Sequence, residues 1–548
     1  MDPETSPRTP AGRSAWDPGS ARTLWELIAR RAAVDPDGVY LTLYGDTLTV
    51  GRLHATNLRY AGALATVGLG PGDKVVLVLP TCQEFFFAFF GALALGAVPV
   101  PLYPTLAPEL KARIFRSSEA RAVVTVDWFR DDVEAARAGA PDMRHYLTPD
   151  RLETGVPPGC LPEVREDDVC FLQYTSGSTA APRGVVLSHA NVMGTVRLMV
   201  HAVGATPADT VVSWLPLYHD MGLIGCGFVP LYIGCRLVLL PPDLRSPRAW
   251  LEAITEHRGV FTVAPDFGYR NCVRNIHDTT GLDLSSLRMA LSGAESVRPS
   301  TIRAFEARFG VRDVFCPAYG LAEATLAVAI WPPGEPLRLD ASGTYVSVGR
   351  ACAGVRVAVA DPDGGGRARP GEAGEILVQG PGVMQGYYRE PEATARAIRH
   401  GWLHTGDLGF LDADGYLYIT GRLKDLIIVG GENVAPVDLE EIVDGLSGIR
   451  YSAAVGVESE RMGTQRLHIV AEVRSETAAP EELARLAKSV AAEVHRRRGL
   501  RPARVLLVST HTIPKTSSGK IQRSALAAQV AAGALRERIL HQTGTARA

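Results

Sequence analysis

The feature of the sequence that most limits its fold is an alternation of short apolar strands with helices, starting at Val75. We expect Val75–Leu79 to be a strand, Glu84–Leu95 a helix and Val98–Leu102 a second strand. A helix over Glu109–Ser118 and a strand over Ala122–Val126 continue the pattern. Strands that alternate with helices of this length form α/β units on a largely parallel sheet. Because the chain has 548 residues, we expect about two to four folding units rather than one core.

The most hydrophobic stretch, Phe85–Tyr103, does not predict a membrane span. Pro99 and Pro101 interrupt it, and they leave an apolar run of roughly 15 residues where a span needs about 20. We expect a helix buried in a large core, followed by a strand. The composition, with 46% hydrophobic and 21% charged residues, is that of a soluble globular protein. The net charge of −2 gives no reason to expect a nucleic acid partner.

The cysteines and the first residues indicate a cytoplasmic protein. The eight cysteines are scattered and form no C-x-x-C pair, which favours reduced thiols and argues against a structural zinc site. Residues 1–21 are rich in Pro, Ser, Arg and Gly and contain no apolar segment like that of a signal peptide. We therefore expect a disordered tail there.

One loop, Tyr174–Gly184, carries the strongest chemical signal. We expect a strand to lead into it and a second to leave it. Its hydroxyl side chains surround a glycine, and such a loop can turn N–H groups and hydroxyls toward an anion. Pro182 adds a rigid turn, and a polar hairpin without a ligand is the alternative at this point. The residues that would hold a phosphate are Thr175, Ser176, Gly177, Ser178, Thr179 and Arg183.

Six stretches taken together, in this order and at this spacing, resemble the adenylate-forming superfamily of acyl-CoA synthetases, peptide-synthetase adenylation domains and luciferases. The sequences of these motifs are most similar to those of the fatty acyl-AMP ligases, notably Trp-Leu-Pro-x-x-His-Asp-Met-Gly and Tyr-Gly-Leu-Ala-Glu-Ala-Thr-Leu. The resemblance covers about Leu24–Leu535. The six stretches are Tyr174–Gly184, Trp214–Gly222, Tyr319–Thr325, His404–Leu408, Gly421–Asp425 and Pro514–Arg523.

The resemblance implies an α/β fold with two domains. Residues 22–422 would form a large N-terminal adenylation domain, with two layered α/β sheets and a small β-rich subdomain. A hinge at 423–426, with Lys424 at the turning position, would lead to a small mobile α+β domain at 427–548. The short strands expected at Val355–Ala360 and Gly374–Gln379 fit the β-rich subdomain. The long helix expected at Pro480–Arg498 fits the last domain.

The resemblance also implies the reaction. Such enzymes use ATP and Mg²⁺ to activate a carboxylic acid as an acyl-adenylate, with release of pyrophosphate. Negative charge crowds on the transferring group, so catalysis is mostly positioning and electrostatic stabilisation. The acyl group then passes to a thiol, either of coenzyme A or of the phosphopantetheine of an acyl carrier protein. The acid here would be apolar and fatty-acid-like.

The resemblance assigns functional roles to the residues of this chain that match the family's motifs. Lys520 would neutralise the α-phosphate and carboxylate oxygens, Glu323 would bind Mg²⁺, and Tyr319 would stack on the adenine. Asp407, assisted by Arg422, would bind the ribose hydroxyls. The remaining nucleotide-binding residues would be Gly293, Ala294, Glu295, Gly320, Leu321 and Ala322. The acyl pocket would comprise His219, Asp220, Met221, Gly222, Asp266, Phe267 and Tyr269, with His219 and Thr175 also assigned to catalysis.

The chain departs from the acyl-AMP ligases in one respect that concerns the thiol. Those enzymes carry an insertion thought to restrain the small domain and prevent transfer to coenzyme A, whereas this chain has only Ala327–Tyr345 at that place. The loop Gly430–Pro436 is more similar to the acyl-CoA synthetases. Coenzyme A is therefore the favoured acceptor, with a carrier protein as the alternative. An amino-acid adenylation domain and a non-catalytic nucleotide-binding protein are the rival interpretations.

Overall fold

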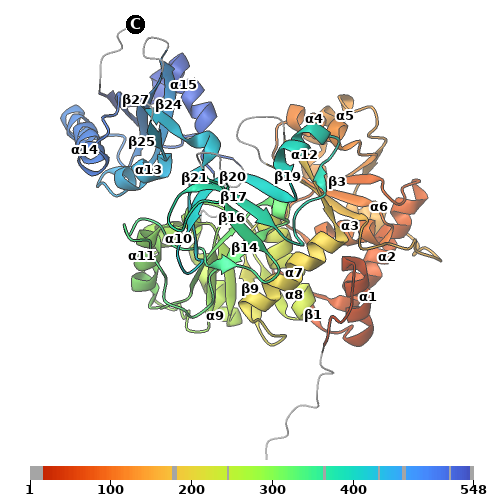
Figure 1. Ribbon diagram of the computed structural model, residues 1–548. Helices are drawn as coiled ribbons and strands as arrows, with labels where there is room; N and C mark the ends of the chain where they lie inside the picture. Colours follow the sequence, from red (N-terminus) through yellow and green to blue (C-terminus); the bar gives the residue numbers. More distant parts are fainter. Residues whose placement is uncertain are drawn as a thin grey trace, which may run out of the picture. The chain divides into compact units, whose positions relative to one another are not determined.

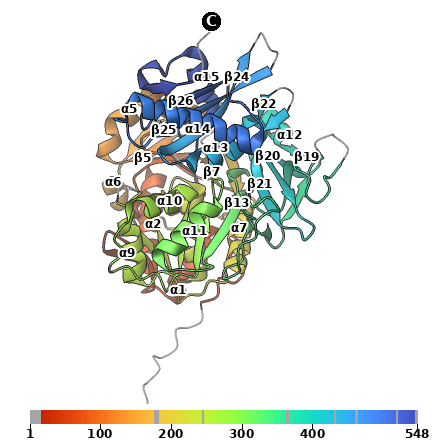
Figure 2. The same cartoon turned by 90° about the vertical axis from the view of Figure 1, so that its left-hand side faces the viewer.

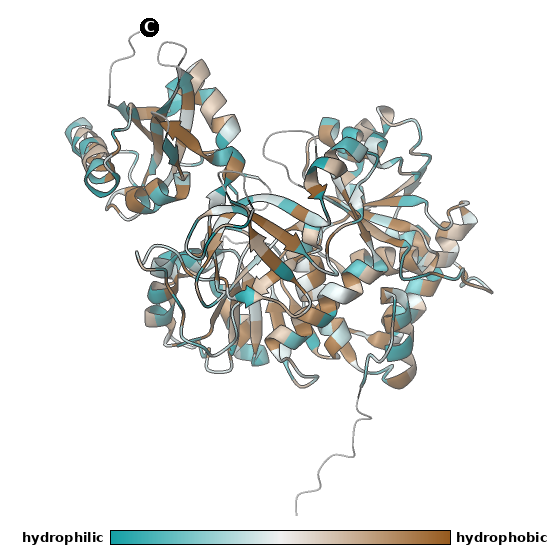
Figure 3. Ribbon diagram, viewed as in Figure 1, coloured by the Kyte–Doolittle hydropathy of each residue, from teal (hydrophilic) through white to brown (hydrophobic). Residues whose placement is uncertain are grey.

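The computed structural model describes residues 16–175, 182–242, 246–361, 366–429, 432–459, 464–516 and 520–543, except the side chains of 459 and 464. The chain divides into two compact units. Unit 1 comprises residues 1–172, 187–263 and 283–287, and unit 2 comprises residues 173–186, 264–282 and 288–548. Strands in both units are largely hydrophobic, whereas many helices carry a hydrophilic face (Figure 3).

Unit 1 contains a parallel sheet with the order β4-β3-β5-β6. Its strands are β3 (Lys74–Val78), β4 (Val98–Pro101), β5 (Ala122–Thr125) and β6 (His145–Leu147). The helix α3 (Gln83–Ala94) lies between β3 and β4 in the sequence, and every residue from Phe85 to Ala94 is buried. The expected strand–helix–strand pattern and the buried helix are confirmed. Within the described residues, no helix combines the length and hydrophobicity that a membrane crossing requires.

A second set of strands in unit 1 has the order β11-β9-β10-β1-β2. Its members are β1 (Val39–Leu43), β2 (Asp46–Thr49), β9 (Thr210–Ser213), β10 (Arg236–Leu239) and β11 (Phe261–Ala264). The helices of this part of the chain are α1 (Leu24–Val34), α2 (Val50–Thr66), α7 (His189–Val203), α8 (Val229–Ile233) and α9 (Arg248–His257) (Figure 1).

Only residues 16–21 of the expected tail at 1–21 belong to the described residues. Residues 1–15 lie outside the described residues. Trp16 donates a hydrogen bond from Nε1 to the Tyr232 carbonyl at 2.8 Å, and Ala21 is fully buried. A composition rich in Pro and Gly concealed this anchor, because one indole can fix a polar segment through its buried ring and its N–H.

Unit 2 begins with the strands β12 (Met289–Ser292), β13 (Phe315–Gly320), β14 (Ala327–Ile330) and β15 (Arg350–Ala351). β12 and β13 are parallel, and β13, β14 and β15 are antiparallel neighbours. The accompanying helices are α10 (Asp266–Asn275) and α11 (Pro299–Phe309). A β-rich part follows, as expected, with β16 (Arg356–Val359), β17 (Gly374–Gln379), β19 (Ile398–Arg399), β20 (Trp402–Leu411) and β21 (Leu417–Arg422).

The last part of unit 2 is a four-stranded sheet with the order β24-β25-β26-β27. Its strands are β24 (Ile449–Ser459), β25 (Thr464–Val473), β26 (Arg504–Val508) and β27 (Ile539–Gln542). Alternate residues face α13 (Pro436–Asp444) and α14 (Pro480–Arg498) on one side and α15 (Arg523–Ala532) on the other. In Figure 2, α14 and α13 lie in front of β25 and β26. The domain boundary at 423–426 stays a prediction, because this sheet belongs to the same compact unit as residues 288–422.

Two buried histidines make the stability of the fold depend on pH. Burial lowers the pKa of His189 in unit 1 and of His468 in β25 to about 4. Each folded pKa lies below the ordinary value of 6.5, so the unfolded chain binds protons first as the pH falls. The stabilisation is complete above about pH 6.5 and is lost between about 6.5 and 4.

We predict that the free energy of unfolding decreases between pH 7.5 and pH 5 by about 2 kcal/mol for each of these histidines. Denaturant titrations at the two pH values measure it. His468→Gln should remove its share of the decrease, and the exposed His201→Gln should not. An unchanged pH dependence in both His189→Gln and His468→Gln would contradict this account.

Candidate active site

The expected phosphate loop lies between β7 (Val169–Tyr174) and β8 (Gly184–Ser188). Thr175 donates its backbone N–H to the Arg183 carbonyl at 3.0 Å and so closes the base of the loop. β8 pairs with β18 (Gly386–Tyr387) through Val185 and Val186. Four residues assigned to phosphate binding, Ser176, Gly177, Ser178 and Thr179, lie outside the described residues.

Tyr387, on β18, connects the base of this loop to the expected metal ligand. Its hydroxyl donates to Glu323 Oε1 at 2.9 Å, and the Arg183 guanidinium lies 5.3 Å from the centre of its ring. Arg183 also forms an ion pair with Glu390 at 3.0 Å. The structure thus brings Arg183 and Glu323 into contact with the same tyrosine, although 140 positions separate them in the sequence. No motif of the sequence singled out Tyr387.

A second cluster joins Tyr319, Asp407 and Arg422. The Tyr319 hydroxyl donates to Asp407 Oδ2 at 2.8 Å, and Arg422 Nε lies 2.8 Å from Asp407 Oδ1. Register brings the last two together, because Asp407 on β20 faces Arg422 on β21. The Asp407 carboxylate raises the pKa of Arg422, and burial together with Asp407 raises the pKa of Tyr319.

Asp407 is buried at 4% exposure, but its hydrogen-bonding capacity is not exhausted. A carboxylate offers about four lone-pair positions, and Tyr319 and Arg422 use one on each oxygen. Positions therefore remain for two further donors, such as vicinal hydroxyls. The assignment of these three residues to adenosine binding stays a prediction.

The backbone next to these clusters is strained or crowded. Ala294 and Thr325 have φ of 66° and 65°, a region that costs energy for residues other than glycine, and most for a β-branched one. Thr325 is held there because its hydroxyl donates to the Gly382 carbonyl at 2.6 Å. A Cβ on Gly320 would lie 1.6 Å from the Leu326 carbonyl oxygen. Leu321 and Ala322 lie between these points, where Ala322–Ala324 forms a 3₁₀ turn.

Asp266 and Glu295 form helix caps, which the sequence did not reveal. Asp266 is buried and accepts the Arg298 N–H and the Thr301 hydroxyl, both at 3.1 Å, at the start of α11. Glu295 accepts the Phe267 N–H at 2.6 Å, at the start of α10. Burial raises the pKa of both carboxyl groups, and Asp266 raises the pKa of Glu295 further. Each carboxylate thus caps the neighbouring helix, as carboxylates at helix N-termini do.

Two of the predicted acyl-pocket residues, Tyr269 and Asp266, are buried and have partners within unit 2. Tyr269 is fully buried, packs its ring against Phe305 and Phe315 and donates its hydroxyl to the Leu291 carbonyl. Asp266 accepts one hydrogen bond on each oxygen. The assignment of both residues to the acyl pocket stays a prediction. Phe267 is partly exposed and stays a prediction, as does Glu295 beside the nucleotide.

The remaining predicted acyl-pocket residues belong to unit 1. His219 Nδ1 lies 2.7 Å from Asp220 Oδ1, which also accepts the Met221 N–H at 2.7 Å. Met221–Phe228 forms a π-helix, a rare element that often occurs at functional sites. A Cβ on Gly222 would lie 2.2 Å from the Pro216 carbonyl oxygen, so only glycine fits there. Sequence periodicity could not reveal the π-helix, because its apolar residues surround the helix on all sides.

Lys520 and Lys424 lie in the last part of unit 2. Lys520 belongs to a tight connection in which Thr516 N–H donates to its carbonyl at 2.8 Å and its own N–H donates to Thr516 Oγ1 at 3.1 Å. Residues 517–519 lie outside the described residues. Lys424 lies in the 3₁₀ turn Leu423–Asp425, directly after Arg422.

The residues present fit a magnesium ion held chiefly by nucleotide phosphates. Among the described residues, no three His, Cys, Asp or Glu side chains form a metal site. Mg²⁺ in nucleotide enzymes usually takes one or two carboxylates and completes its shell with phosphates and water. Glu323 supplies one hard oxygen beside the base of the expected phosphate loop.

We predict that Gly320→Ala lowers the melting temperature strongly, because its Cβ would overlap a carbonyl oxygen. Overpacking of this kind costs about 1–3 kcal/mol. Gly159→Ala is the matched control, since no atom lies within 4 Å of the added Cβ. Thermal unfolding followed by circular dichroism measures both. Equal melting temperatures for the two variants would refute the crowding.

Comparisons with known proteins identify the family. The model of the AMP-binding enzyme family matches residues 28–388. A long-chain-fatty-acid–AMP ligase of Mycobacterium marinum is 34% identical, with 90% of this chain and 92% of the relative covered. A medium-chain-fatty-acid–[acyl-carrier-protein] ligase of Moorena producens is 32% identical, with 84% and 86% covered.

A solved structure from work on fatty acyl-adenylate ligases of E. coli and L. pneumophila has a TM-score of 0.86 and 30% identity, with 94% of this chain and 99% of that chain covered. An anthranilate CoA ligase at 24% identity and a TM-score of 0.83, with 93% and 98% covered, shares the fold. Together with the family match over 28–388, these findings show that the chain is an adenylate-forming protein of the AMP-binding enzyme family.

Proposed function

We propose that this protein activates a fatty acid with ATP, forming an acyl-adenylate and pyrophosphate, and then passes the acyl group to a thiol. The observation that carries the proposal is the buried Asp407, held by Tyr319 and Arg422 with free acceptor positions. It supports an adenosine site next to the strained Ala294 and Thr325. The fatty acyl-AMP ligase relatives support the acid.

In the first half-reaction a carboxylate oxygen bonds to the α-phosphorus while the bond from that phosphorus to the pyrophosphate oxygen breaks. Asp407 binds the ribose and Tyr319 lies against the adenine. Lys520 and Arg183 offset negative charge on the transferring group, where fixed charges stabilise the transition state most. Tyr387 holds the Glu323 carboxylate through its hydrogen bond. When bound at Glu323, Mg²⁺ would neutralise phosphate charge.

We propose that the thiol belongs to the phosphopantetheine of an acyl carrier protein. Relatives that are AMP ligases, and one that is an acyl-carrier-protein ligase, support this acceptor. Coenzyme A is the second candidate because the connection Ala327–Tyr345 is short. The alignment with the FadD26 ligase of Mycobacterium bovis runs over 571 positions, more than the 548 residues of this chain. That relative therefore has segments that this chain lacks.

Lys520→Ala should lower fatty-acid-dependent ATP–pyrophosphate exchange by on the order of 10² to 10³, the loss expected for one charge that stabilises a transition state. The control is Lys488→Ala, which removes an exposed lysine from α14, a helix packed on the sheet of β24 to β27. It should leave the rate of pyrophosphate exchange unchanged. The assignment of Lys520 is abandoned if its variant exchanges pyrophosphate as fast as the Lys488 variant.

The acceptor can be identified with a panel of fatty acids, ATP and Mg²⁺, in parallel with millimolar coenzyme A or with a phosphopantetheinylated carrier protein. Mass spectrometry measures acyl-AMP, acyl-CoA and acylated carrier. We expect acyl-AMP alone and with coenzyme A, and acylated carrier in the other arm. Efficient acyl-CoA formation would assign coenzyme A instead. The absence of any acyl-AMP would overturn the proposed function itself.

A further inference from the structure

Helix α13 is held at both of its ends by side chains from the earlier part of unit 2. Its last residue, Asp444, contacts α10 and α11, and its third residue, Asp438, contacts the short connection Ala327–Tyr345. None of these contacts belongs to the clusters described above around Asp407 and Glu323. We call the contacts of Asp444 and of Asp438 together the α13 clamp.

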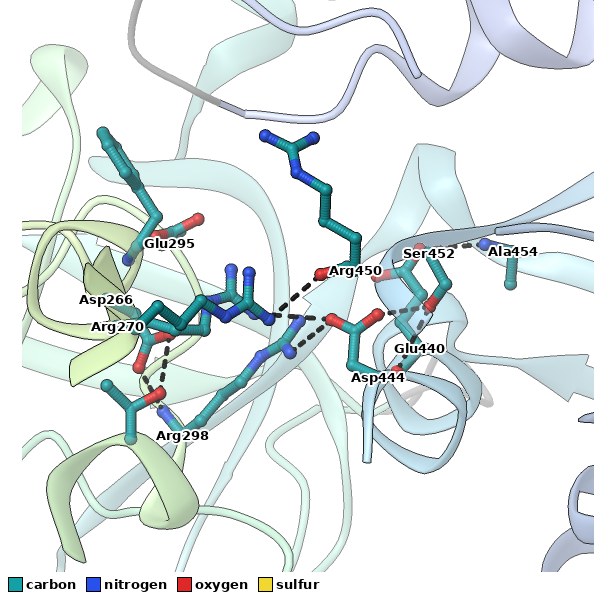
Figure 4. Close-up of polar contacts among 12 residues, drawn as sticks. Asp266, Arg270, Glu295, Arg298, Glu440, Asp444, Arg450, Ser452 and Ala454 are labelled. Atoms are coloured by element: carbon teal, nitrogen blue, oxygen red, sulfur yellow. Dashed lines mark hydrogen bonds and ion pairs between the residues drawn. The ribbon is translucent and has the colours of Figure 1, made fainter. Parts of the chain in front are cut away.

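At the C-terminal end of α13, two arginines converge on one buried carboxylate (Figure 4). Arg298 NH1 lies 2.6 Å and Arg270 NH1 3.4 Å from Asp444 Oδ2. The Asp444 side chain is 5% exposed, and its other oxygen accepts the Ser452 hydroxyl at 2.7 Å. A carboxylate at a helix C-terminus opposes the helix dipole. Asp444 therefore does not stabilise its own helix, and its binding energy lies in the contact with α10 and α11.

At the N-terminal end of α13, Asp438 accepts a hydrogen bond from the Tyr345 hydroxyl and forms an ion pair with Arg498 of α14. The Asp438 side chain is 4% exposed. Tyr345 ends the connection that is short compared with the family's insertion. Although this connection is short, one of its residues contacts α13.

The same network extends to the segments that carry Lys520 and Lys424. Arg523, three positions after Lys520, lies 2.7 Å from Glu440 of α13 and 3.2 Å from Asp425 of the expected hinge. Glu440 is 2% exposed on its side chain. Anything that fixes α13 therefore also fixes the start of α15 and the residue after Lys424.

The start of the connection that carries Lys520 also contacts α10, through the ring of Tyr451. Lys515, which pairs with Ile521 across the Lys520 connection, lies over the Tyr451 ring at 3.5 Å. The Arg270 guanidinium lies over the same ring at 5.3 Å. Burial lowers the pKa of Lys515 to about 8, and the attraction of Glu472 and of Glu295 opposes this. The start of the Lys520 connection therefore lies beside Arg270 of α10.

We propose that the α13 clamp, Asp444 with Arg270 and Arg298 at one end and Asp438 with Tyr345 at the other, holds the last part of the chain in the orientation that forms the adenylate. This inference rests on the proposed function. In the thiol-transfer step Lys520 must withdraw from the adenylate, so the clamp must open. A clamp that consists of few contacts can open. Until it opens, it holds the last part of the chain in the orientation that forms the adenylate.

The test separates the two half-reactions in the full chain. ATP–pyrophosphate exchange measures adenylate formation, and chemically synthesised acyl-AMP supplied with coenzyme A or carrier protein measures transfer alone. Asp444→Asn keeps the shape and an acceptor for Ser452 but removes the charge. Because a buried pair that loses one partner is strongly weakened, we expect about tenfold slower exchange and about threefold faster transfer. Each tenfold change in population corresponds to ~1.4 kcal/mol.

Further variants define the clamp. Tyr345→Phe should act in the same direction, and Arg298→Gln combined with Asp444→Asn should cost no more than Asp444→Asn alone, since coupled partners are not additive. Glu493→Gln is the matched control, because Glu493 pairs with Arg496 and Arg497 at the exposed end of α14 and touches none of the clamp residues. It should change neither half-reaction.

A readout without catalysis distinguishes failure of the clamp from failure of the proposed function. Hydrogen exchange of residues 422–427 and of α13 should become at least about fivefold faster in Asp444→Asn and stay unchanged in Glu493→Gln. If exchange at these amides is the same in all variants, or if both half-reactions of Asp444→Asn fall by the same factor, the clamp is only structural and the proposal is wrong.

Discussion

The carboxylate of Asp407 is the group on which the site in unit 2 depends. A buried anion is tolerated only when it is paired and hydrogen-bonded, and here a tyrosine hydroxyl and a guanidinium satisfy one position on each oxygen. These partners come from β13 and β21, which meet β20 only in the folded protein. Within the described residues these two contacts fix the Asp407 carboxylate without a ligand. Such preorganisation is what makes an electrostatic site effective.

Unit 2 contains several buried carboxylates besides Asp407, and each one joins segments that are distant in the sequence. Asp266 and Glu295 each cap the neighbouring helix, and Arg298, next to the α11 cap, reaches Asp444. Glu440 then joins α13 to Arg523. Ion pairs thus join α13 to Arg298 beside α11 and, separately, to Arg523 in the segment after Lys520. Because low dielectric strengthens such contacts and also penalises an unpaired charge, a change at one point should be felt along it.

Much of the fold could be predicted because its signals are local. The strand–helix–strand pattern from Val75, the buried phenylalanine helix and the helix Pro480–Arg498 follow from periodicity and from helix-breaking residues. The roles that the ordered motifs assign to Asp407 and Glu323 stay predictions. The features that the sequence did not predict depend on tertiary contacts. Tyr387 contacts Arg183 and Glu323 only because β18 pairs with β8 in the folded protein. The partners of Tyr269 and Asp266, the Leu291 carbonyl and the Thr301 hydroxyl, likewise could not be predicted from the sequence.

The central claim is that this chain has one site shaped for an acyl-adenylate, and binding of a stable analogue tests it most directly. In such an analogue a sulfamate replaces the phosphate that links a fatty acyl chain to adenosine. Isothermal titration should show saturable binding at one site, at least about 100-fold tighter than AMP or the free fatty acid, since sites bind reaction-like states more tightly than substrates. Asp407→Asn should weaken it. Binding no tighter than that of AMP, or unaffected by Asp407→Asn, would contradict the account.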